Sequence, residues 1–236
     1  MKPPGILVSL LVLLFFVPAF SVFASEETME ESMEGSDMEM VDAEEGMMYS
    51  FEVMIINVHD MQPLSPGVFV VHTGNLSMNF EGQMAPPGLE PLAEYGSTDA
   101  LAEYVTDLDG AIKVFTIGGP TPPGMNISTI IEFQTTEMPL YLSGAMMDAA
   151  TNDGFALLDA VMLADENGTA LSSTTDTQNY DAGTEENTAL GSGFEGGQPD
   201  PSRGEENIDN GVPTEEPVSM HPQLNETVME VVITVL

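Results

Sequence analysis

The residues with the clearest chemical potential are carboxylates beside turns in the second half of the chain. Asp153 immediately precedes the apolar stretch that begins at Gly154. Asp181 and Glu185 flank Gly183, which disfavours a helix, so a tight turn should bring their two side chains together. Oxygen-rich loops suit calcium, which takes about six to eight oxygen ligands in flexible geometry. In a chain with 39 Asp and Glu, a solvated acidic surface is the competing interpretation.

The residues that enzymes commonly use for catalysis are scarce in this sequence. The chain has no cysteine, which excludes thiolate metal sites and cysteine nucleophiles, and it has only three histidines. No serine stands in a Gly-x-Ser-x-Gly motif, and no phosphate-binding glycine loop precedes a helical pattern. His72 and His221 fit either structural hydrogen bonding or a histidine–carboxylate metal pair. The sequence therefore predicts no catalytic residues and no enzyme; a secreted hydrolase using loop carboxylates is the alternative from another class.

The charge of the chain limits its partners. Three Lys and Arg stand against 39 Asp and Glu, for a formal net charge of −36. Binding to nucleic acid or to an anionic lipid surface needs clustered basic residues, so neither is an expected partner. A third interpretation follows from the same composition: a purely structural protein whose function is its acidic surface.

The first 49 residues have the pattern of an export signal followed by a tether. Lys2 precedes an apolar run of 12 residues, 6–17, and small residues end the segment at Ala24. Such a run fits a cleaved signal peptide over 1–24 and is short for a membrane span, which needs about 20 apolar residues. An uncleaved anchor is the alternative. Residues 25–49 are acidic and are predicted to be a disordered tether. We expect a secreted protein, extracellular or at the cell surface, without a membrane span after signal cleavage.

In the rest of the chain, 50–236, short apolar runs alternate with turn residues, as expected for a set of short strands. Apolar and β-branched runs bounded by Gly, Pro and Asn predict eight strands, at 51–58, 66–72, 76–80, 111–117, 126–134, 140–146, 154–163 and 228–235. Leucine and alanine spacing between 89 and 105 predicts two short helices inserted between the third and fourth strands. The prediction is an all-β fold: an eight-stranded antiparallel β-sandwich or barrel with a short helical insertion.

Two acidic turns and one long connection complete the pattern. Asp107–Gly110 and Asp165–Gly168 are interpreted as hairpin turns, because neither has the ligand spacing of an EF-hand. The connection 164–227 exceeds 60 residues, and such a long loop is typically functional or disordered. It contains Asp181 and Glu185.

Several stretches, in order along 50–236, resemble the spondin domain. These are Phe51–Asn57 followed by Gln62–Pro66, then Leu92–Gly96, Thr151–Phe155, Tyr180–Glu185, Met220–Pro222 and the final strand. The resemblance is greatest to stand-alone microbial spondin-like proteins. The animal members, F-spondin and mindin, are extracellular-matrix and adhesion proteins.

The resemblance implies an eight-stranded antiparallel β-sandwich related to calcium-and-lipid-binding domains. It implies Ca²⁺ as the bound ion, held by Asp153, Asp181 and Glu185. The animal members have Asp at the third position, so Glu185 is a departure that puts affinity and ion choice in question. The missing cysteines are a second departure. By this resemblance the protein is a cell-surface or matrix adhesion module with an unidentified ligand.

Overall fold

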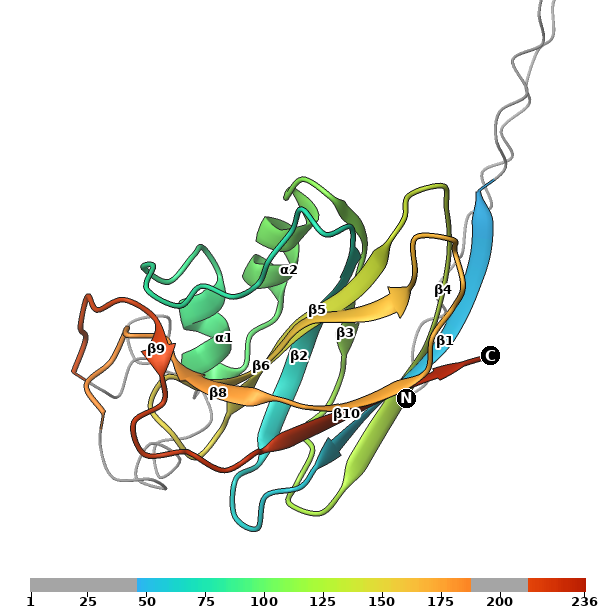
Figure 1. Cartoon of the computed structure of the whole chain (residues 1–236). Coiled ribbons are helices and arrows are strands. Elements are labelled where there is room, and N and C mark those ends of the chain that lie inside the picture. The colour runs from blue at the N-terminus through green and yellow to red at the C-terminus, as the bar shows by residue number, and fades with distance from the viewer. Residues whose placement is uncertain (1–45, 188–211) are drawn as a thin grey trace, which may run out of the picture. The chain divides into compact units, whose positions relative to one another are not determined.

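A computed structural model of the chain describes residues 46–187 and 212–236, and within them ten strands form two antiparallel sheets that pack face to face (Figure 1). The four-stranded sheet has the order β4 (Asn126–Thr135), β1 (Met47–Asn57), β10 (Met229–Val235), β7 (Ser173–Asp176). The six-stranded sheet has the order β3 (Ala111–Ile117), β2 (Leu64–His72), β5 (Leu140–Asp148), β6 (Gly154–Ala164), β8 (Gln178–Asp181), β9 (Ser219–Met220). The predicted all-β sandwich with a short helical insertion is confirmed.

The core between the sheets follows from strand periodicity. Along β1 every second residue from Tyr49 to Asn57 is buried, and the intervening residues are half-buried on the outer face. The inward-facing Phe51 and Ile55 contact aliphatic side chains of both sheets, including Leu142 and Val231. A strand whose side chains alternate in this way can present only one face to a core, so the register of β1 is fixed.

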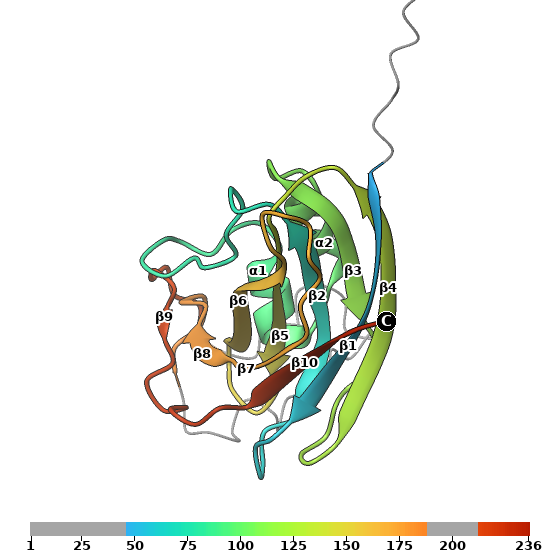
Figure 2. The same ribbon diagram turned by 45° about the vertical axis from the view of Figure 1, so that its right-hand side comes forward.

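The six-stranded sheet is buried on both faces near its centre. In β2 and β5 almost every residue is buried, because the second face of this sheet packs against the helices α1 (Leu89–Tyr95) and α2 (Asp99–Thr106) (Figure 2). The helix α1 ends at Gly96, whose φ of 70° lets its backbone N–H return to the carbonyl of Leu92. The molecule therefore has three layers: helices, the larger sheet and the smaller sheet.

Three sequence expectations need correction. Residues 76–80 are not a strand; Leu76, Met78 and Phe80 are buried against the helical layer without pairing to another strand. The predicted long loop contains three short strands, β7, β8 and β9, so the fold has more than eight strands. β1 starts at Met47, inside the predicted tether. The expected signal peptide and the rest of that tether lie outside the described residues.

The predicted acidic turns are found in two different settings. Asp165–Gly168 is a turn closing a hairpin: the N–H of Asp165 donates to the carbonyl of Thr169, and Ala164 pairs with Ala170. Asp107–Gly110 joins α2 to β3 and is therefore not a hairpin turn. Within the described residues, neither helix is long and apolar enough to cross a membrane.

Candidate metal site

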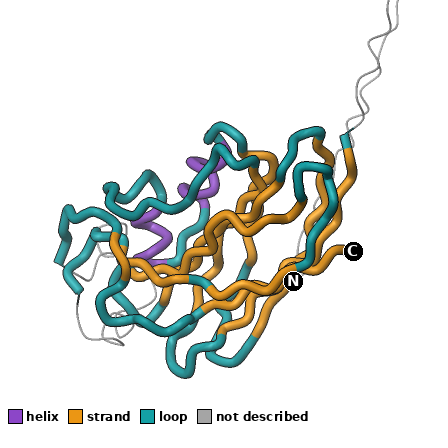
Figure 3. Tube along the Cα trace, in the orientation of Figure 1, coloured by secondary structure: helices purple, strands orange, loops and turns teal. Residues whose placement is uncertain are grey.

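The two predicted aspartate ligands meet where β6 begins and β8 ends. Gly154 pairs with Asp181 in the antiparallel register, and the N–H of Ala182 donates to the carbonyl of Asp153 at 3.1 Å. This end of the sandwich consists mainly of loops and lies away from the C-terminus (Figure 3). Backbone pairing therefore brings together two acids that are 28 positions apart, by their numbers, in the sequence.

The turn before β6 is held by Thr151. Its Oγ1 donates to the carbonyl of Asp148 at 2.6 Å and accepts the N–H of Gly154 at 2.8 Å. A Cβ on Gly154 would lie 2.5 Å from that Oγ1, so the position requires glycine. These contacts fix the entry into β6 and with it the position of Asp153.

The turn after β8 depends on Gly183, as the sequence indicated. Its φ is 73°, and its N–H donates to Oδ1 of Asp181 at 2.8 Å. The carbonyl of Gly183 accepts the N–H of Glu216 at 2.9 Å and the hydroxyl of Thr214 at 3.0 Å. The turn that holds Asp181 is thus also attached to the chain that leads into β9.

Asp153 has two carboxylate oxygens in very different environments. Oδ2 accepts the N–H groups of Thr184 and Glu185 at 2.8 and 3.1 Å, and the Thr184 hydroxyl at 3.3 Å. Oδ1 is buried and has no hydrogen-bond partner among the described residues. Burial, and then the charge of Asp181, raise the pKa of Asp153 above its ordinary value. A buried carboxylate with a free oxygen beside a second acid is suited to bind a cation.

Glu185 joins this cluster through its backbone. Its N–H binds Asp153, whereas its side-chain Oε2 accepts the amide of Asn152 at 3.3 Å. Within residues 46–187 and 212–236, no three His, Asp or Glu side chains form a ready-made metal-binding group. Glu185 is thus linked to Asp153 through its main chain and to the neighbouring Asn152 through its side chain.

No basic side chain in the described ranges compensates these acids. Asp153, Asp181 and Glu185 are 0%, 5% and 6% exposed. The only Lys or Arg in the described ranges is Lys113, on β3, and β2, β5 and β6 separate β3 from β8 in the sheet. Burying a carboxylate is costly unless it is hydrogen-bonded or neutralised, so the unpartnered Oδ1 of Asp153 favours a bound proton or cation at this position.

Two polar side chains, Asn179 within β8 and His221 directly after β9, lie close to the candidate site in the chain. The N–H of His221 donates to the carbonyl of Asn179 at 3.0 Å, and His221 Nδ1 accepts the N–H groups of Gln223 and Leu224. His221 Nε2 and Asn179 Oδ1 are buried without hydrogen-bond partners in the described part of the chain. The sequence had suggested His221 only by its motif; the role of Asn179 carried no sequence signal.

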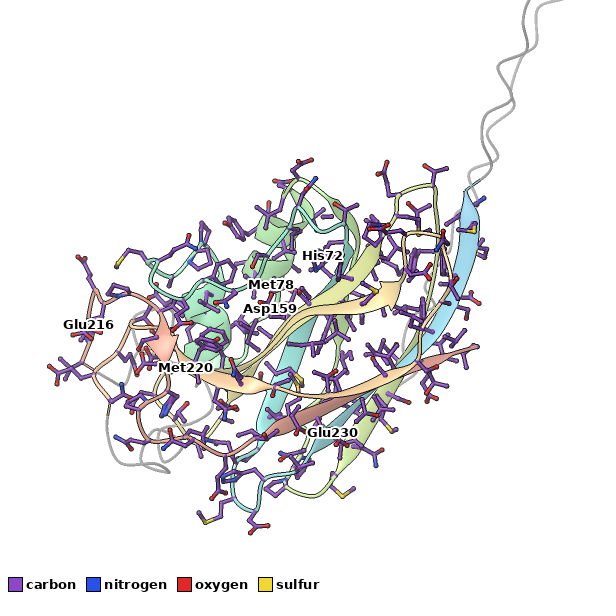
Figure 4. All side chains as sticks on the ribbon, viewed as in Figure 1. His72, Met78, Asp159, Glu216, Met220 and Glu230 are labelled. Carbon is purple, nitrogen blue, oxygen red and sulfur yellow. The ribbon has the colours of Figure 1, made fainter. Side chains whose placement is uncertain are left out.

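His72 lies elsewhere, in a buried polar cluster. Its Nδ1 donates to the carbonyl of Thr73 at 2.5 Å, and its Nε2 accepts the hydroxyl of Ser143 at 2.9 Å. Burial lowers its pKa, against opposing effects of the Thr73 carbonyl and the Asp159 charge (Figure 4). Ser143 also accepts the N–H of Ala160, whose φ of 48° places it in the left-handed region. His72 and Ser143 are 0% exposed, which fits the structural interpretation of this histidine.

One buried acid was missed by the sequence analysis. Asp148 ends β5 with 0% exposure, and both of its carboxylate oxygens lack hydrogen-bond partners among the described residues. Burial raises its pKa well above the ordinary value. In the sequence it reads as an ordinary turn residue, because nothing local indicates that its side chain is enclosed.

Comparison with known proteins adds no assignment. No protein-family model matches the chain, and no curated protein matches it either.

Proposed function

We propose that this protein is an exported calcium-binding module of the spondin type that attaches to a cell-surface or extracellular-matrix ligand. Asp153, Asp181 and Glu185 are its carboxylate ligands. The observation that carries the proposal is the burial of Asp153 next to Asp181, with Oδ1 of Asp153 lacking a hydrogen-bond partner among the described residues. The resemblance of the sequence to spondin domains supports the same residues.

The donor set fits a hard divalent ion. All three side chains offer oxygen, and carboxylates are the preferred ligands of calcium in proteins. Bound calcium would supply positive charge between acids that otherwise repel one another. Asp153 and Asp181 lie at the junction of β6, β8 and the turn at Gly183, so an ion bound there would stiffen the loops at this end of the sandwich.

The adhesive part of the proposal rests on the resemblance and on the position of the site. The candidate site lies where β6 begins and β8 ends, at the end of the sandwich that consists mainly of loops (Figure 3). The sequence predicts no catalytic residues, and this prediction favours a binding function over turnover. Retention of the calcium-loaded protein on a matrix or cell surface, reversed by a chelator, is the expected behaviour.

Thermal unfolding at fixed ionic strength tests whether the protein binds calcium. Extracellular modules bind calcium at about 10⁻⁴–10⁻³ M, so 10 mM calcium should stabilise the fold by about 1.4–2.7 kcal/mol. For a domain of this size the Tm should rise by roughly 3–10 °C. Asp181→Asn removes one ligand charge and should abolish most of this rise.

The control is Asp176→Asn, which changes an exposed acid on β7. It should leave the calcium response unchanged. An equal rise in the parent protein and in Asp181→Asn would reject the site.

A further inference from the structure

Four asparagines of the described ranges stand in the acceptor motif of N-linked sugars, Asn-x-Ser or Asn-x-Thr with x other than proline. The motifs are Asn75–Ser77, Asn126–Ser128, Asn167–Thr169 and Asn225–Thr227. All four asparagines are exposed. The described ranges hold nine asparagines, and the four that are buried or half-buried all lie outside the motif. The motif therefore coincides with the exposure that an attached sugar chain needs.

Two buried asparagines outside the motif use their amide nitrogens to hold the fold. Nδ2 of Asn57 donates to two backbone carbonyls at 2.7 and 2.8 Å, and Nδ2 of Asn179 donates to a backbone carbonyl at 2.6 Å. A sugar on either nitrogen would break these hydrogen bonds. At the exposed Asn75, Asn126 and Asn225 a sugar would instead extend into solvent. The folded chain can thus carry sugars at the motif and not at these buried positions.

Each motif lies next to a different edge of the two sheets. In the described part of the chain, the edges of the smaller sheet are β4 and β7, and those of the larger sheet are β3 and β9. Asn126 is the first residue of β4, Asn167 lies in the hairpin turn that precedes β7, and Asn225 lies in the connection that follows β9. Asn75 lies beside Gly110, the residue before β3, because its Cβ is 3.7 Å from where a Cβ on Gly110 would be. Each edge therefore has one exposed acceptor asparagine near it in the chain or in space.

One of these edges, β4, has no other protection against pairing with a second chain. Proteins limit such pairing with short edge strands, lysine, proline or bulges. β7 and β9 are only four and two residues long, and β3 contains Lys113. β4 is ten residues long without lysine or proline, pairs with β1 in a continuous register, and has Ile130 62% exposed (Figure 2). β4 is the edge that most needs a cover.

We propose that Asn75, Asn126, Asn167 and Asn225 are N-glycosylation sites, and that the sugar at Asn126 shields the edge of β4 from pairing with other chains. The inference rests on the export proposed above and is independent of the calcium site. A hydrated sugar chain at the start of an edge strand covers its unpaired backbone groups without using any of them.

The modification needs a sugar donor from the exporting cell, a sugar joined through phosphate to a lipid carrier. The side-chain amide nitrogen of the asparagine attacks C1 of this sugar and forms the new C1–N bond. The C1–O bond to the phosphate breaks, the lipid phosphate leaves with the electron pair, and the amide nitrogen loses one proton.

Peptide mass spectrometry of the exported full chain, purified from cells that naturally produce it, tests the modification. The mass of a sugar chain should be found on the peptides of the four motif asparagines. Asn187 is the control, because it is exposed and lies outside the motif, and it should be unmodified. An exported chain with unmodified Asn126, or with a sugar on Asn187, would overturn the inference.

Variants at one motif separate the sugar from the side chains. Asn126→Gln removes the acceptor, and Ser128→Ala removes the motif but keeps Asn126. Ser128→Thr keeps the motif and a hydroxyl like the one that donates to Oε1 of Glu52 at 2.9 Å. At high salt, which screens repulsion between acidic chains, light scattering should show a higher mean mass for Asn126→Gln and Ser128→Ala than for the parent. Ser128→Thr should match the parent.

The outcomes distinguish this inference from the export on which it rests. If the chain is not exported, both fall. If the chain is exported without sugars at the motifs, only this inference falls. If Asn126 carries a sugar but its two loss variants keep the mean mass of the parent, the shielding of β4 is rejected.

Discussion

The backbone N–H of Glu185 donates to Oδ2 of Asp153 at 3.1 Å, so the third predicted ligand is attached to the first through its main chain. The same oxygen accepts the N–H of Thr184 at 2.8 Å. Asp153 therefore has two functions at once: it anchors the turn after β8, and it contributes a negative charge to the candidate site.

Two substitutions at Asp153 separate these functions. Asp153→Ala leaves two N–H groups without an acceptor, and each such loss costs about 1–3 kcal/mol. Asp153→Asn keeps an oxygen acceptor and removes the repulsion with Asp181. In chelator, Asp153→Ala should lower the Tm by several degrees, roughly 2–4 °C per kcal/mol, and Asp153→Asn should stay close to the parent. Neither variant should respond to calcium. Equal losses of Tm in chelator would show that the acceptor role is unimportant.

The turn at Gly183 should tolerate no side chain. Its φ is 73°, and a Cβ would lie 2.2 Å from the carbonyl oxygen of Glu216, a backbone atom. Gly82 is the matched control, with a φ of 78° and nothing within 4 Å of its Cβ position. Gly82→Ala should cost only the conformational term, about 1–2 kcal/mol. Gly183→Ala should cost clearly more in urea unfolding and should weaken the calcium response. An equal loss of unfolding free energy in Gly183→Ala and Gly82→Ala would mean that the chain near Glu216 shifts freely.

The bulge at Ala160 offers a stabilising substitution. With a φ of 48°, this alanine occupies a region that costs a non-glycine residue about 1–2 kcal/mol. Ala160→Gly relieves the strain and keeps the N–H that binds Ser143, so chemical denaturation should show a gain of roughly 0.5–1 kcal/mol. Ala100→Gly, at an exposed position of α2, should instead lose about 1 kcal/mol. A loss at both positions would indicate that Ala160 is not strained in solution.

Asp148 should make the fold sensitive to rising pH. Burial raises its pKa well above the ordinary 3.8, so the native state retains a proton that the unfolded state releases. Its stabilising contribution is complete below pH 3.8 and is lost as the pH rises through the native-state pKa. The difference in Tm between Asp148→Asn and the parent should therefore become more favourable to the variant between pH 4 and pH 8, measured in chelator.

The fixed cost of burying an amide does not affect this comparison, because it is the same at every pH. Asp153, whose pKa is also raised, contributes in the same direction in both proteins. His72 and His221, whose pKa values are lowered, act in the opposite direction below about pH 6.5 and cancel in the comparison. A difference that does not change with pH would show that Asp148 is solvated or paired in the native protein.

Strands with apolar, β-branched runs were predictable from sequence, and short polar strands were not. The seven predicted strands that exist include β1, which alternates between core and surface, and β2 and β5, which are buried almost throughout. Residues 76–80 alternate equally well, but their apolar side chains pack against helices and the backbone finds no partner strand. β7, β8 and β9 are short and mostly polar, and only pairing with distant strands makes them extended.

Some features of the candidate site were also predictable from sequence, and others were not. The turn at Gly183 was predictable because glycine disfavours a helix there, and its φ of 73° agrees with a tight turn. The family resemblance implied that Asp153 and Asp181 share a site, whereas the pairing of Gly154 with Asp181 that brings them together depends on sheet order. The interaction of Glu185 with Asn152, the burial of Asp148 and the N–H groups accepted by His221 Nδ1 depend on what surrounds each side chain. No local pattern encodes them.

Backbone hydrogen bonds hold together the residues on either side of 188–211. The N–H of Glu186 donates to the carbonyl of Val212, and the N–H of Thr214 donates to that of Thr184, each at 2.8 Å, around the bridge between Glu185 and Pro213. When the ends of a segment are held together in this way, doubling its length costs only about 0.6 kcal/mol. The position between Asn187 and Val212 is therefore an insertion point, where peptides or whole domains can be grafted for display while the sandwich remains folded.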